Sequence, residues 1–201
     1  MTLKKDKKLR WAILTTGLGR NACDTIKNVS EGKVKDSEIA CLIYESEPCV
    51  AKDMAIEKGI EAIKIKKGDF TDTNSYYDYL LSKLKYFNVD YILLLSYEYI
   101  IRQKILNAFR NRIINIHPSL FPSFLRTRTA IQEALEYGVK VTGITTHIID
   151  DQVDEGEILC QKAIKVKAHD TFETLYPRFS RHGEKIILKT IKVIENRHFG
   201  H

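Results

Sequence analysis

Two polar side chains interrupt an apolar run near the middle of the chain. Residues 113–121 read Ile-Ile-Asn-Ile-His-Pro-Ser-Leu-Phe, so Asn115 and His117 are two positions apart and Pro118 follows. In a strand, side chains two positions apart point to the same face, and proline ends regular pairing. An amide N–H and an imidazolium side by side are suitable donors for the oxyanion of a tetrahedral intermediate. The pair is therefore a candidate site for acyl transfer.

A carboxylate further along the chain could complete this chemistry. Residues 147–156 read His-Ile-Ile-Asp-Asp-Gln-Val-Asp-Glu-Gly, and Asp154 lies in a predicted loop. There it could hold a proton on His117 and relay one through water. Acyl transfer to an amine needs these groups and needs no serine or cysteine nucleophile. However, Asn and His before a proline are also common turn residues, so the residues alone leave both interpretations open.

A glycine-rich turn near the N-terminus is a second candidate binding site. It reads Gly17-Leu18-Gly19-Arg20-Asn21 and lies between a predicted strand and a predicted helix, where free backbone N–H groups can bind an anion. With Ala22 it also fits the looser dinucleotide fingerprint, for which Glu45 or Glu47 would be the ribose-binding carboxylate. A tight turn that binds no ligand is the alternative.

These residues have to be positioned by an alternating series of strands and helices. Hydrophobic patterns predict strands at 10–16, 39–44, 60–65, 90–95 and 113–117, with helices between them. This alternation predicts a parallel sheet. Extended runs at 141–150 and 157–166 predict added antiparallel strands, and 172–193 predicts a closing helix with a possible break at Pro177. The fold class is therefore α/β: a Rossmann-like twisted, mainly parallel sheet with helices on both faces and antiparallel strands near the C-terminal end.

Length and composition favour one soluble domain. The chain has 201 residues, of which 44% are hydrophobic and 29% charged, so residues 1–201 are expected to form a single domain, with 1–9 as a flexible basic tail. No run approaches the roughly 18 apolar residues of a membrane span, and no apolar signal core follows the basic start. Four cysteines without close paired spacing suit reduced thiols. A cytoplasmic location is predicted.

The net charge of +6 allows two kinds of partner. A basic chain can bind nucleic acid, or it can be an enzyme for anionic ligands. RNA binding is less favoured because no aromatic RNA-binding signature is present. No metal is expected either, because the histidines lack a ligand spacing such as H-E-x-x-H.

Three spaced motifs together resemble a known enzyme family. They are Asn115-Ile-His-Pro-Ser-Leu-Phe-Pro122, Gly143-x-x-x-His147 and Asp150-x-x-x-Asp154-x-Gly156-x-Ile158-x-x-Gln161. The chain resembles the 10-formyltetrahydrofolate-dependent formyltransferases over almost its whole length, and most of all those that formylate glycinamide ribonucleotide in purine biosynthesis. This resemblance implies formyl transfer from 10-formyltetrahydrofolate to an amine, without metal, and it implies that Asn115, His117 and Asp154 are the catalytic trio.

The resemblance also implies two binding regions and their ligands. A phosphorylated amine would bind at Gly17, Leu18, Gly19, Arg20 and Asn21, with Glu184 of the last helix. Folate would bind at Tyr97, Glu98, Tyr99, Ile100, Ile101, Ile113, His147, Asp150 and Asp151. The expected partners are these small molecules, with no membrane or nucleic acid, and the expected state is a monomer or homodimer.

The chain departs from the usual pattern of this family in three places. Tyr97-Glu98-Tyr99 replaces Phe-Met-Arg or similar, the segment 123–129 is one residue longer and has no glycine, and Glu155-Gly156-Glu157 replaces a Gly-Gly-Pro type of sequence. Arg126 and Arg128 in the longer segment could engage phosphate or the folate tail, or be solvated. These differences keep two alternatives open: a sugar-nucleotide or other amine N-formyltransferase, and a non-catalytic nucleotide-binding module.

Overall fold

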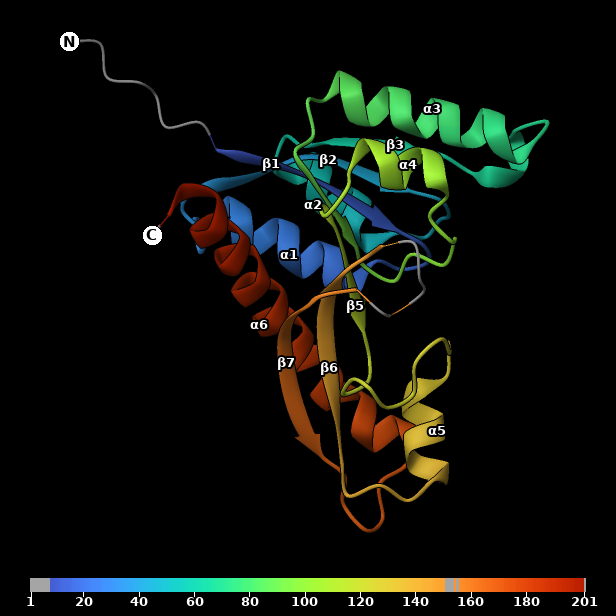
Figure 1. Cartoon of the computed structure of the whole chain (residues 1–201), viewed down its shortest axis with the longest axis vertical. Coiled ribbons are helices and arrows are strands. Elements are labelled where there is room, and N and C mark those ends of the chain that lie inside the picture. The colour runs from blue at the N-terminus through green and yellow to red at the C-terminus, as the bar shows by residue number, and fades with distance from the viewer. Residues whose placement is uncertain (1–7, 151–153, 155, 201) are drawn as a thin grey trace.

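The fold is a twisted sheet with helices on both faces. The computed structural model describes residues 8–150, 154 and 156–200, and in this part of the chain the sheet has seven strands in the order β3-β2-β1-β4-β5-β6-β7 (Figure 1). Pairing is parallel from β3 to β5, and β6 and β7 are antiparallel. The strands are β1 (Leu9–Thr15), β2 (Ser37–Tyr44), β3 (Glu61–Lys64), β4 (Tyr91–Leu94), β5 (Ile113–His117), β6 (Val141–Ile148) and β7 (Ile158–Lys165). The predicted fold class is confirmed.

Helices cover both faces of this sheet because alternate strand residues enter different cores. Trp11 and Ile13 pack with α1, α2 and α6, whereas Ala12 and Leu14 pack with α3 and α4. A strand covered on both faces must be apolar throughout, which explains the continuous apolar sequence of β4. The helices are α1 (Arg20–Ser30), α2 (Val50–Glu57), α3 (Thr73–Tyr86), α4 (Gln103–Ala108), α5 (Ala130–Glu136) and α6 (Phe172–Phe199), with a short 3-10 turn at Lys67–Asp69.

The order of the strands reverses between β1 and β4. From β1 the chain continues to β2 and β3 on one side, and from β4 it continues to β5 on the other. Open α/β sheets bind ligands at the carboxyl ends of the strands at such a point. The Gly17–Asn21 turn follows β1 and the Tyr97–Ile101 segment follows β4. Both predicted binding regions therefore lie at the switch point.

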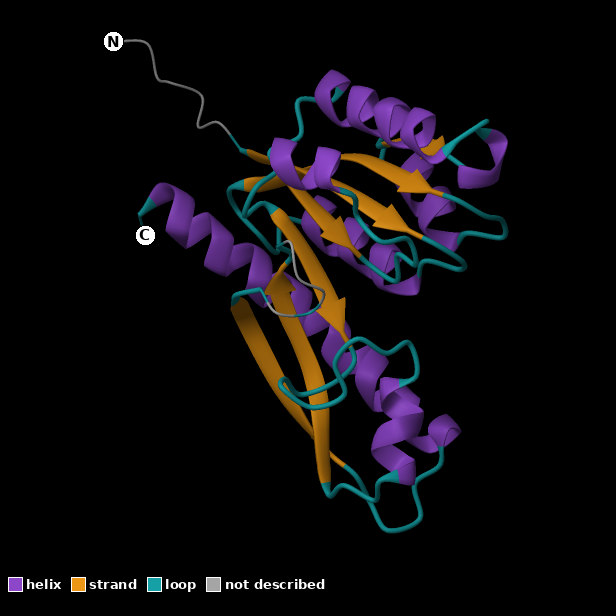
Figure 2. Ribbon diagram, turned by 45° about the vertical axis from the view of Figure 1, so that its right-hand side comes forward, coloured by secondary structure: helices purple, strands orange, loops and turns teal. Residues whose placement is uncertain are grey.

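Strands β6 and β7 extend the sheet beyond the parallel strands, and α6 runs along them (Figures 1 and 2). The predicted break of this helix at Pro177 is wrong, because α6 is continuous over 28 residues. Proline removes one backbone donor, but Leu175 and Phe179 on either side are 0% and 4% exposed and hold the helix on the sheet. Its start is stabilised by a capping box of Thr171 and Thr174.

The structure adds two features to the sequence predictions. Strand β1 begins at Leu9, which is 2% exposed, so Leu9 belongs to the core and not to the predicted tail. Helix α5 was not predicted. Its short apolar face, formed by Ala130, Ile131 and Ala134, is buried, and only this packing in the structure identifies it as a helix face.

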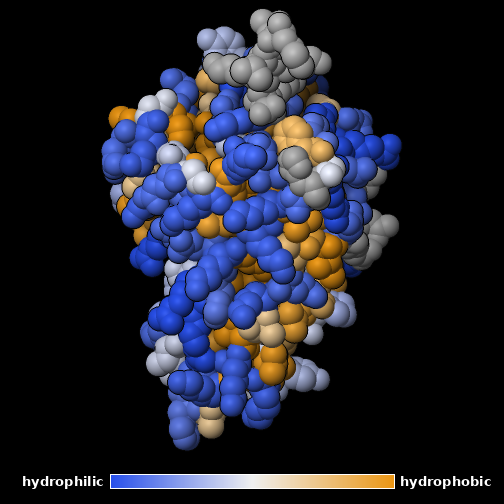
Figure 3. Space-filling view, turned by 90° about the vertical axis from the view of Figure 1, so that its left-hand side faces the viewer, coloured by the Kyte–Doolittle hydropathy of each residue, from blue (hydrophilic) through white to orange (hydrophobic). Residues whose placement is uncertain are grey.

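In the part of the chain that the structure describes, no helix is long and apolar enough to cross a membrane. One face of the molecule, shown in Figure 3, is mainly hydrophilic.

Candidate active site

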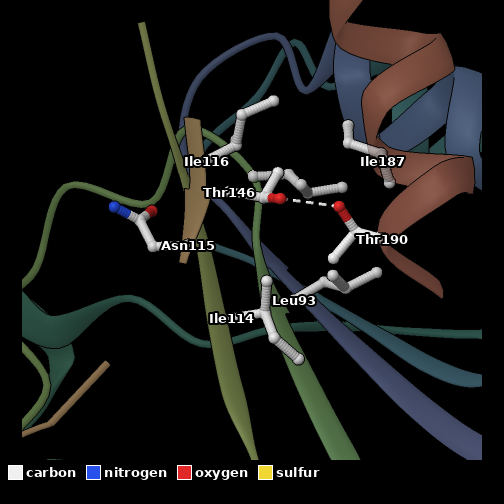
Figure 4. Close-up of a pocket in the computed structure, with 8 residues that line it drawn as sticks. Leu93, Ile114, Asn115, Ile116, Thr146, Ile187 and Thr190 are labelled. Atoms are coloured by element: carbon white, nitrogen blue, oxygen red, sulfur yellow. Dashed lines mark hydrogen bonds between the residues drawn. The ribbon is translucent and has the colours of Figure 1, made fainter. Parts of the chain in front are cut away.

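Strand β5 presents Asn115 and His117 on the face of the sheet opposite α6. Figure 4 shows the Asn115 amide directed away from Ile187 and Thr190 of α6. Ile114, the preceding residue, packs into the core on the α6 side, so the alternation of the strand places His117 with Asn115. His117 is only 6% exposed. The predicted pairing of these two side chains on one face is confirmed.

Asp154 joins this pair from a segment that is distant in the sequence. Its Oδ2 lies 3.7 Å from Nδ1 of His117, and its Oδ1 lies 3.5 Å from Nε2 of His147. The backbone N–H of Arg126 donates to the same carboxylate at 2.8 Å. Asp154 has a φ of 60°, a left-handed conformation that aspartate adopts more readily than most residues. One carboxylate thus contacts two buried imidazoles.

His147, which the sequence assigned to the folate site, contacts this group directly. It pairs with Asn115 across β5 and β6. Its Nδ1 lies 3.1 Å from the carbonyl of Ile148, which can only accept, so Nδ1 carries a hydrogen. Burial lowers the pKa of His147, although Asp154 opposes this, so the neutral ring is favoured. Its Nε2 then accepts from Nδ2 of Asn115 at 3.3 Å, which orients the amide.

The segment after β5 encloses the two histidines. Nε2 of His117 donates to the carbonyl of Phe124 at 2.8 Å. The Phe121 ring packs against both imidazoles, with its centroid 5.3 Å from His117 and 5.0 Å from His147. The side chains of His117, His147 and Asp154 are all buried, so their charges interact more strongly than in water.

Thr145 and Gln161 hold this enclosing segment in place. Thr145 Oγ1 donates to the Ser119 carbonyl at 2.8 Å and accepts from Phe121 N at 3.1 Å. Gln161 Nε2 donates to the Phe121 carbonyl at 3.1 Å. Ser119 is 0% exposed and donates to the carbonyl of Ser123, so it is a structural residue of the motif. Thr145 was missed by sequence reasoning, because only its position opposite His117 reveals its role.

A close backbone approach explains the glycine after Asp154. A Cβ on Gly156 would lie 1.8 Å from the Ile148 carbonyl and 3.6 Å from Cγ of Asp150. Only glycine fits there without movement of the backbone. Gly156 thus lets the segment that carries Asp154 return close to the end of β6.

The Gly17–Asn21 turn has the geometry of an anion site. Gly17 and Gly19 have φ values of 64° and 66°, and Gly19 is the N-cap of α1. The first N–H groups of a helix have no partner within the helix and carry its positive dipole end. Arg20 is exposed at the first helical position, and Leu18 is 44% exposed. Gly17 N–H donates to Ser46 Oγ at 3.1 Å, which braces the turn.

Helix α6 reaches α1 just beyond this turn. A Cβ on Gly183 would lie 3.2 Å from Oδ1 of Asn21, so the missing side chain makes room for that amide. Glu184 accepts from Asn28 Nδ2 at 2.9 Å, and it raises the pKa of the Asp24 carboxyl after the larger effect of burial. The structure therefore places Glu184 beside α1, further along the helix than the glycine turn.

The two carboxylates that a dinucleotide site would use have other partners. Glu45 accepts a hydrogen bond from the Tyr99 hydroxyl. Glu47 pairs with Lys52 at 2.5 Å and with Lys64 at 3.5 Å. This arrangement does not support a ribose-binding role for either carboxylate.

The predicted folate residues are not equivalent in the structure. Ile100 is 66% exposed, whereas Ile101 is buried. Ile113 is 0% exposed and packs in the core on the α3 side, so its contact with folate stays a prediction. Asp151 lies outside the described residues. His147 is buried beside Asn115. The remaining four residues are at the surface or half-buried near the carboxyl ends of β4 and β6: Tyr97, Glu98, Tyr99 and Asp150.

All four cysteines are free thiols, as predicted. Within residues 8–150, 154 and 156–200 no group of three or more His, Cys, Asp or Glu side chains is arranged to hold a metal ion.

The buried His147 should make stability depend on pH. Because its pKa is lowered in the folded state, the unfolded chain binds more protons between that value and about 6.5, and stability rises with pH in this window. Lowering the pH from about 7.5 to about 5.5 should therefore destabilise the protein, and His147→Gln should reduce this loss. Urea unfolding at both pH values measures it.

A matched control for this prediction is His169→Gln, which replaces an exposed histidine. His182, whose pKa burial also lowers, should supply the remaining pH dependence in the His147 variant. An unchanged difference between the two pH values in His147→Gln would contradict the assignment.

Comparisons with known proteins agree with this geometry. A family model described as formyl transferase matches residues 9–191. The chain is 29% identical over 191 residues to the phosphoribosylglycinamide formyltransferase of Bacillus subtilis (strain 168), covering 94% of this chain and 97% of that protein. It is 30% identical over 188 residues to the Homo sapiens trifunctional purine biosynthetic protein adenosine-3, covering 94% of this chain and 18% of that protein.

A solved structure shows the same fold. The crystal structure of glycinamide ribonucleotide transformylase 1 from Symbiobacterium toebii superposes with a TM-score of 0.88 at 31% identity, covering 95% of this chain and 90% of that one. Because the family model matches most of the chain and these relatives match nearly all of it, the protein belongs to the formyl transferase family of enzymes.

Proposed function

We propose that this enzyme transfers the formyl group of 10-formyltetrahydrofolate to the amine of glycinamide ribonucleotide, a step of purine biosynthesis. The relatives that support this acceptor are named phosphoribosylglycinamide formyltransferase and glycinamide ribonucleotide transformylase. The observation that carries the proposal is the convergence of Asn115, His117 and Asp154 at the end of β5, beside the switch point that bears the Gly17–Asn21 turn. An acyl-transfer group and an anion site thus share one edge of the sheet.

In the proposed reaction the acceptor amine attacks the formyl carbon and an oxyanion forms. Asn115 uses one N–H on His147, so its other N–H is available to the oxyanion. Both nitrogens of His117 face acceptors, the Phe124 carbonyl and Asp154, an arrangement that an imidazolium satisfies. Its positive charge stabilises the oxyanion; a direct hydrogen bond requires the Phe124 carbonyl to leave Nε2.

Asp154 completes the proposed proton transfer. Its carboxylate stabilises the His117 imidazolium and accepts, through water, the proton that the attacking amine loses. The intermediate then collapses: the bond between the formyl carbon and N10 of the folate breaks, N10 takes up the proton that Asp154 received, and tetrahydrofolate leaves. The reaction needs no covalent enzyme intermediate, in keeping with the structural position of the buried Ser119.

The test is a spectroscopic assay of tetrahydrofolate formation with a panel of acceptors. The panel contains glycinamide ribonucleotide, an amino-sugar nucleotide and water alone. Turnover with glycinamide ribonucleotide supports the proposal, and preference for the amino sugar refutes this acceptor. Formate release with water alone identifies a hydrolase. No turnover together with thermal stabilisation by NAD identifies a nucleotide-binding module.

Arg20 is proposed to bind the phosphate of the acceptor at the start of α1. Arg20→Ala should raise KM for glycinamide ribonucleotide by about tenfold with little change in kcat, because a charge-assisted contact to a remote phosphate is made equally in the ground and transition states. Steady-state kinetics with the exposed Arg110→Ala as control checks this. An equal loss in both variants would indicate a general charge effect and not a phosphate contact.

We propose further that the described chain forms a single catalytic domain that works in the cytoplasm as a monomer or homodimer. Free thiols suit a reducing compartment, and the strands of both halves belong to one continuous sheet. Light scattering during size-exclusion chromatography measures the oligomeric state.

A further inference from the structure

Segment 96–101 follows β4 and accepts hydrogen bonds from side chains of several other elements. Thr16, at the end of β1, donates to the Ser96 carbonyl from its backbone N at 3.1 Å and from Oγ1 at 2.5 Å. Arg128 donates to the Glu98 carbonyl at 3.1 Å. Ser96 itself has a φ of 59°, a conformation that a serine keeps only when its surroundings determine it. The segment is therefore held in one conformation.

Helix α3 supplies the most buried of these hydrogen-bonding side chains. The hydroxyls of Tyr76 and Tyr97 lie 2.5 Å apart. Tyr77, the next residue of α3, donates to the Ile100 carbonyl, also at 2.5 Å. Tyr76 and Tyr77 are 1% and 2% exposed. Burial raises the pKa of Tyr76 to about 12 and also raises that of Tyr97, so both remain neutral phenols that can share one hydrogen bond.

Aromatic packing reinforces the same connection. The Tyr97 and Tyr99 ring centroids are 5.6 Å apart, and those of Tyr76 and Tyr99 are 6.0 Å apart. Both pairs have the edge-to-face geometry that aromatic rings prefer. The Tyr99 hydroxyl then continues to Glu45 at the end of β2. The Tyr97 and Tyr99 side chains thus point toward α3 and β2, whereas Glu98 and Ile100 are exposed and free to face a ligand.

We propose that the hydroxyl pair of Tyr76 and Tyr97 is a positioning device for the folate co-substrate: it fixes the backbone of segment 96–101 in the conformation that binds folate. Neither hydroxyl takes part in the chemistry. This inference rests on the proposed function, since it assumes that the segment binds folate. It differs from that function by assigning folate affinity to α3, a helix on the face opposite α1 and α6.

Tyr76→Phe should raise KM for 10-formyltetrahydrofolate by about tenfold, leave KM for the acceptor within about twofold and change kcat little. The reason is that the Tyr97 hydroxyl is then left without its buried partner, which costs more than the net value of one hydrogen bond. The double variant Tyr76→Phe with Tyr97→Phe removes both hydroxyls and should recover most of the loss. Tyr86→Phe, a 75% exposed tyrosine of the same helix, is the matched control.

Calorimetric titration with the stable analogue 10-formyl-5,8-dideazafolate measures folate binding in the same four proteins, independently of turnover. Wild-type protein that binds the analogue but transfers no formyl group would refute the proposed function alone. A purely structural role for Tyr76 would lower the melting temperature and affect both substrates equally. The inference is overturned if Tyr76→Phe binds the analogue as wild type does, if both KM values rise together, or if the double variant is no better than the single one.

Discussion

Asp154→Asn is expected to lower kcat by roughly 1,000-fold. Asparagine has nearly the same shape but no negative charge, so it neither stabilises a charged His117, 3.7 Å away, nor accepts a proton from the acceptor amine. The amide oxygen can still accept from Arg126 N, so the segment should keep its position. Single-turnover kinetics with saturating folate and acceptor separates this loss of chemistry from a loss of binding.

The control for this variant is Asp78→Asn, at an exposed carboxylate that pairs with Lys104. It removes the same charge far from the site and should leave kcat unchanged, because exposed ion pairs contribute little. If Asp154→Asn turned over with near wild-type kcat, the proton-transfer role of Asp154 would be wrong, whatever its effect on stability.

Asn115→Ala is expected to lower kcat by at least about 100-fold, the usual cost of removing one oxyanion donor. The variant also leaves Nε2 of the buried His147 without its donor. KM values should change much less than kcat, because the amide acts on charge that develops only in the transition state. Steady-state kinetics with each substrate varied in turn measures this difference.

The matched control is Asn107→Ala in α4, where the asparagine is exposed and bonded to Gln103. A melting temperature close to that of the wild type shows that Asn115→Ala is folded. A fall in kcat no larger than in Asn107→Ala would exclude an oxyanion role for Asn115.

Burial and the Asp154 carboxylate shift the pKa of His147 in opposite directions, and the protonation state of His147 decides how the site responds to acid. His147 Nε2 faces the Asp154 carboxylate at 3.5 Å and the Asn115 amide at 3.3 Å. The neutral ring accepts from the amide, whereas a protonated ring would pair with the carboxylate instead. Burial lowers the pKa of His147 and so keeps the ring in the form that orients Asn115. We therefore expect the site to work at neutral pH and to lose this arrangement in acid.

Local patterns in the sequence were sufficient to predict most strands of the sheet. Strands β1, β2, β4 and β5 are covered on both faces, and such strands have continuous apolar sequences that can be recognised without a structure. The period of two in 113–117 also placed Asn115 and His117 on one side without any structure. The same pattern placed Ile113 on that side, but it did not show that Ile113 packs into the core with residues of α3 and α4.

Features that depend on distant contacts escaped the sequence analysis. Helix α5 has seven residues, too few for a clear helical period, and its buried face is defined by packing against α6 and the sheet. The continuity of α6 through Pro177 depends on the burial of its neighbours. The hydroxyl pair of Tyr76 and Tyr97 joins a helix to a segment 21 residues later, and two tyrosines in a sequence do not reveal such a bond.

The sequence by itself thus determined the strands, the shared face of Asn115 and His117, the glycine turn and the resemblance to formyltransferases, because each depends on residues close together in the chain. Only the tertiary structure decided that His147 orients Asn115, that Asp154 contacts two imidazoles, and that Glu45 is taken by Tyr99. Except for the contact of Asp154 with His147, these contacts join residues 32 to 54 positions apart. Their geometry follows from antiparallel pairing of β5 with β6 and from packing across the switch point, which no local pattern encodes.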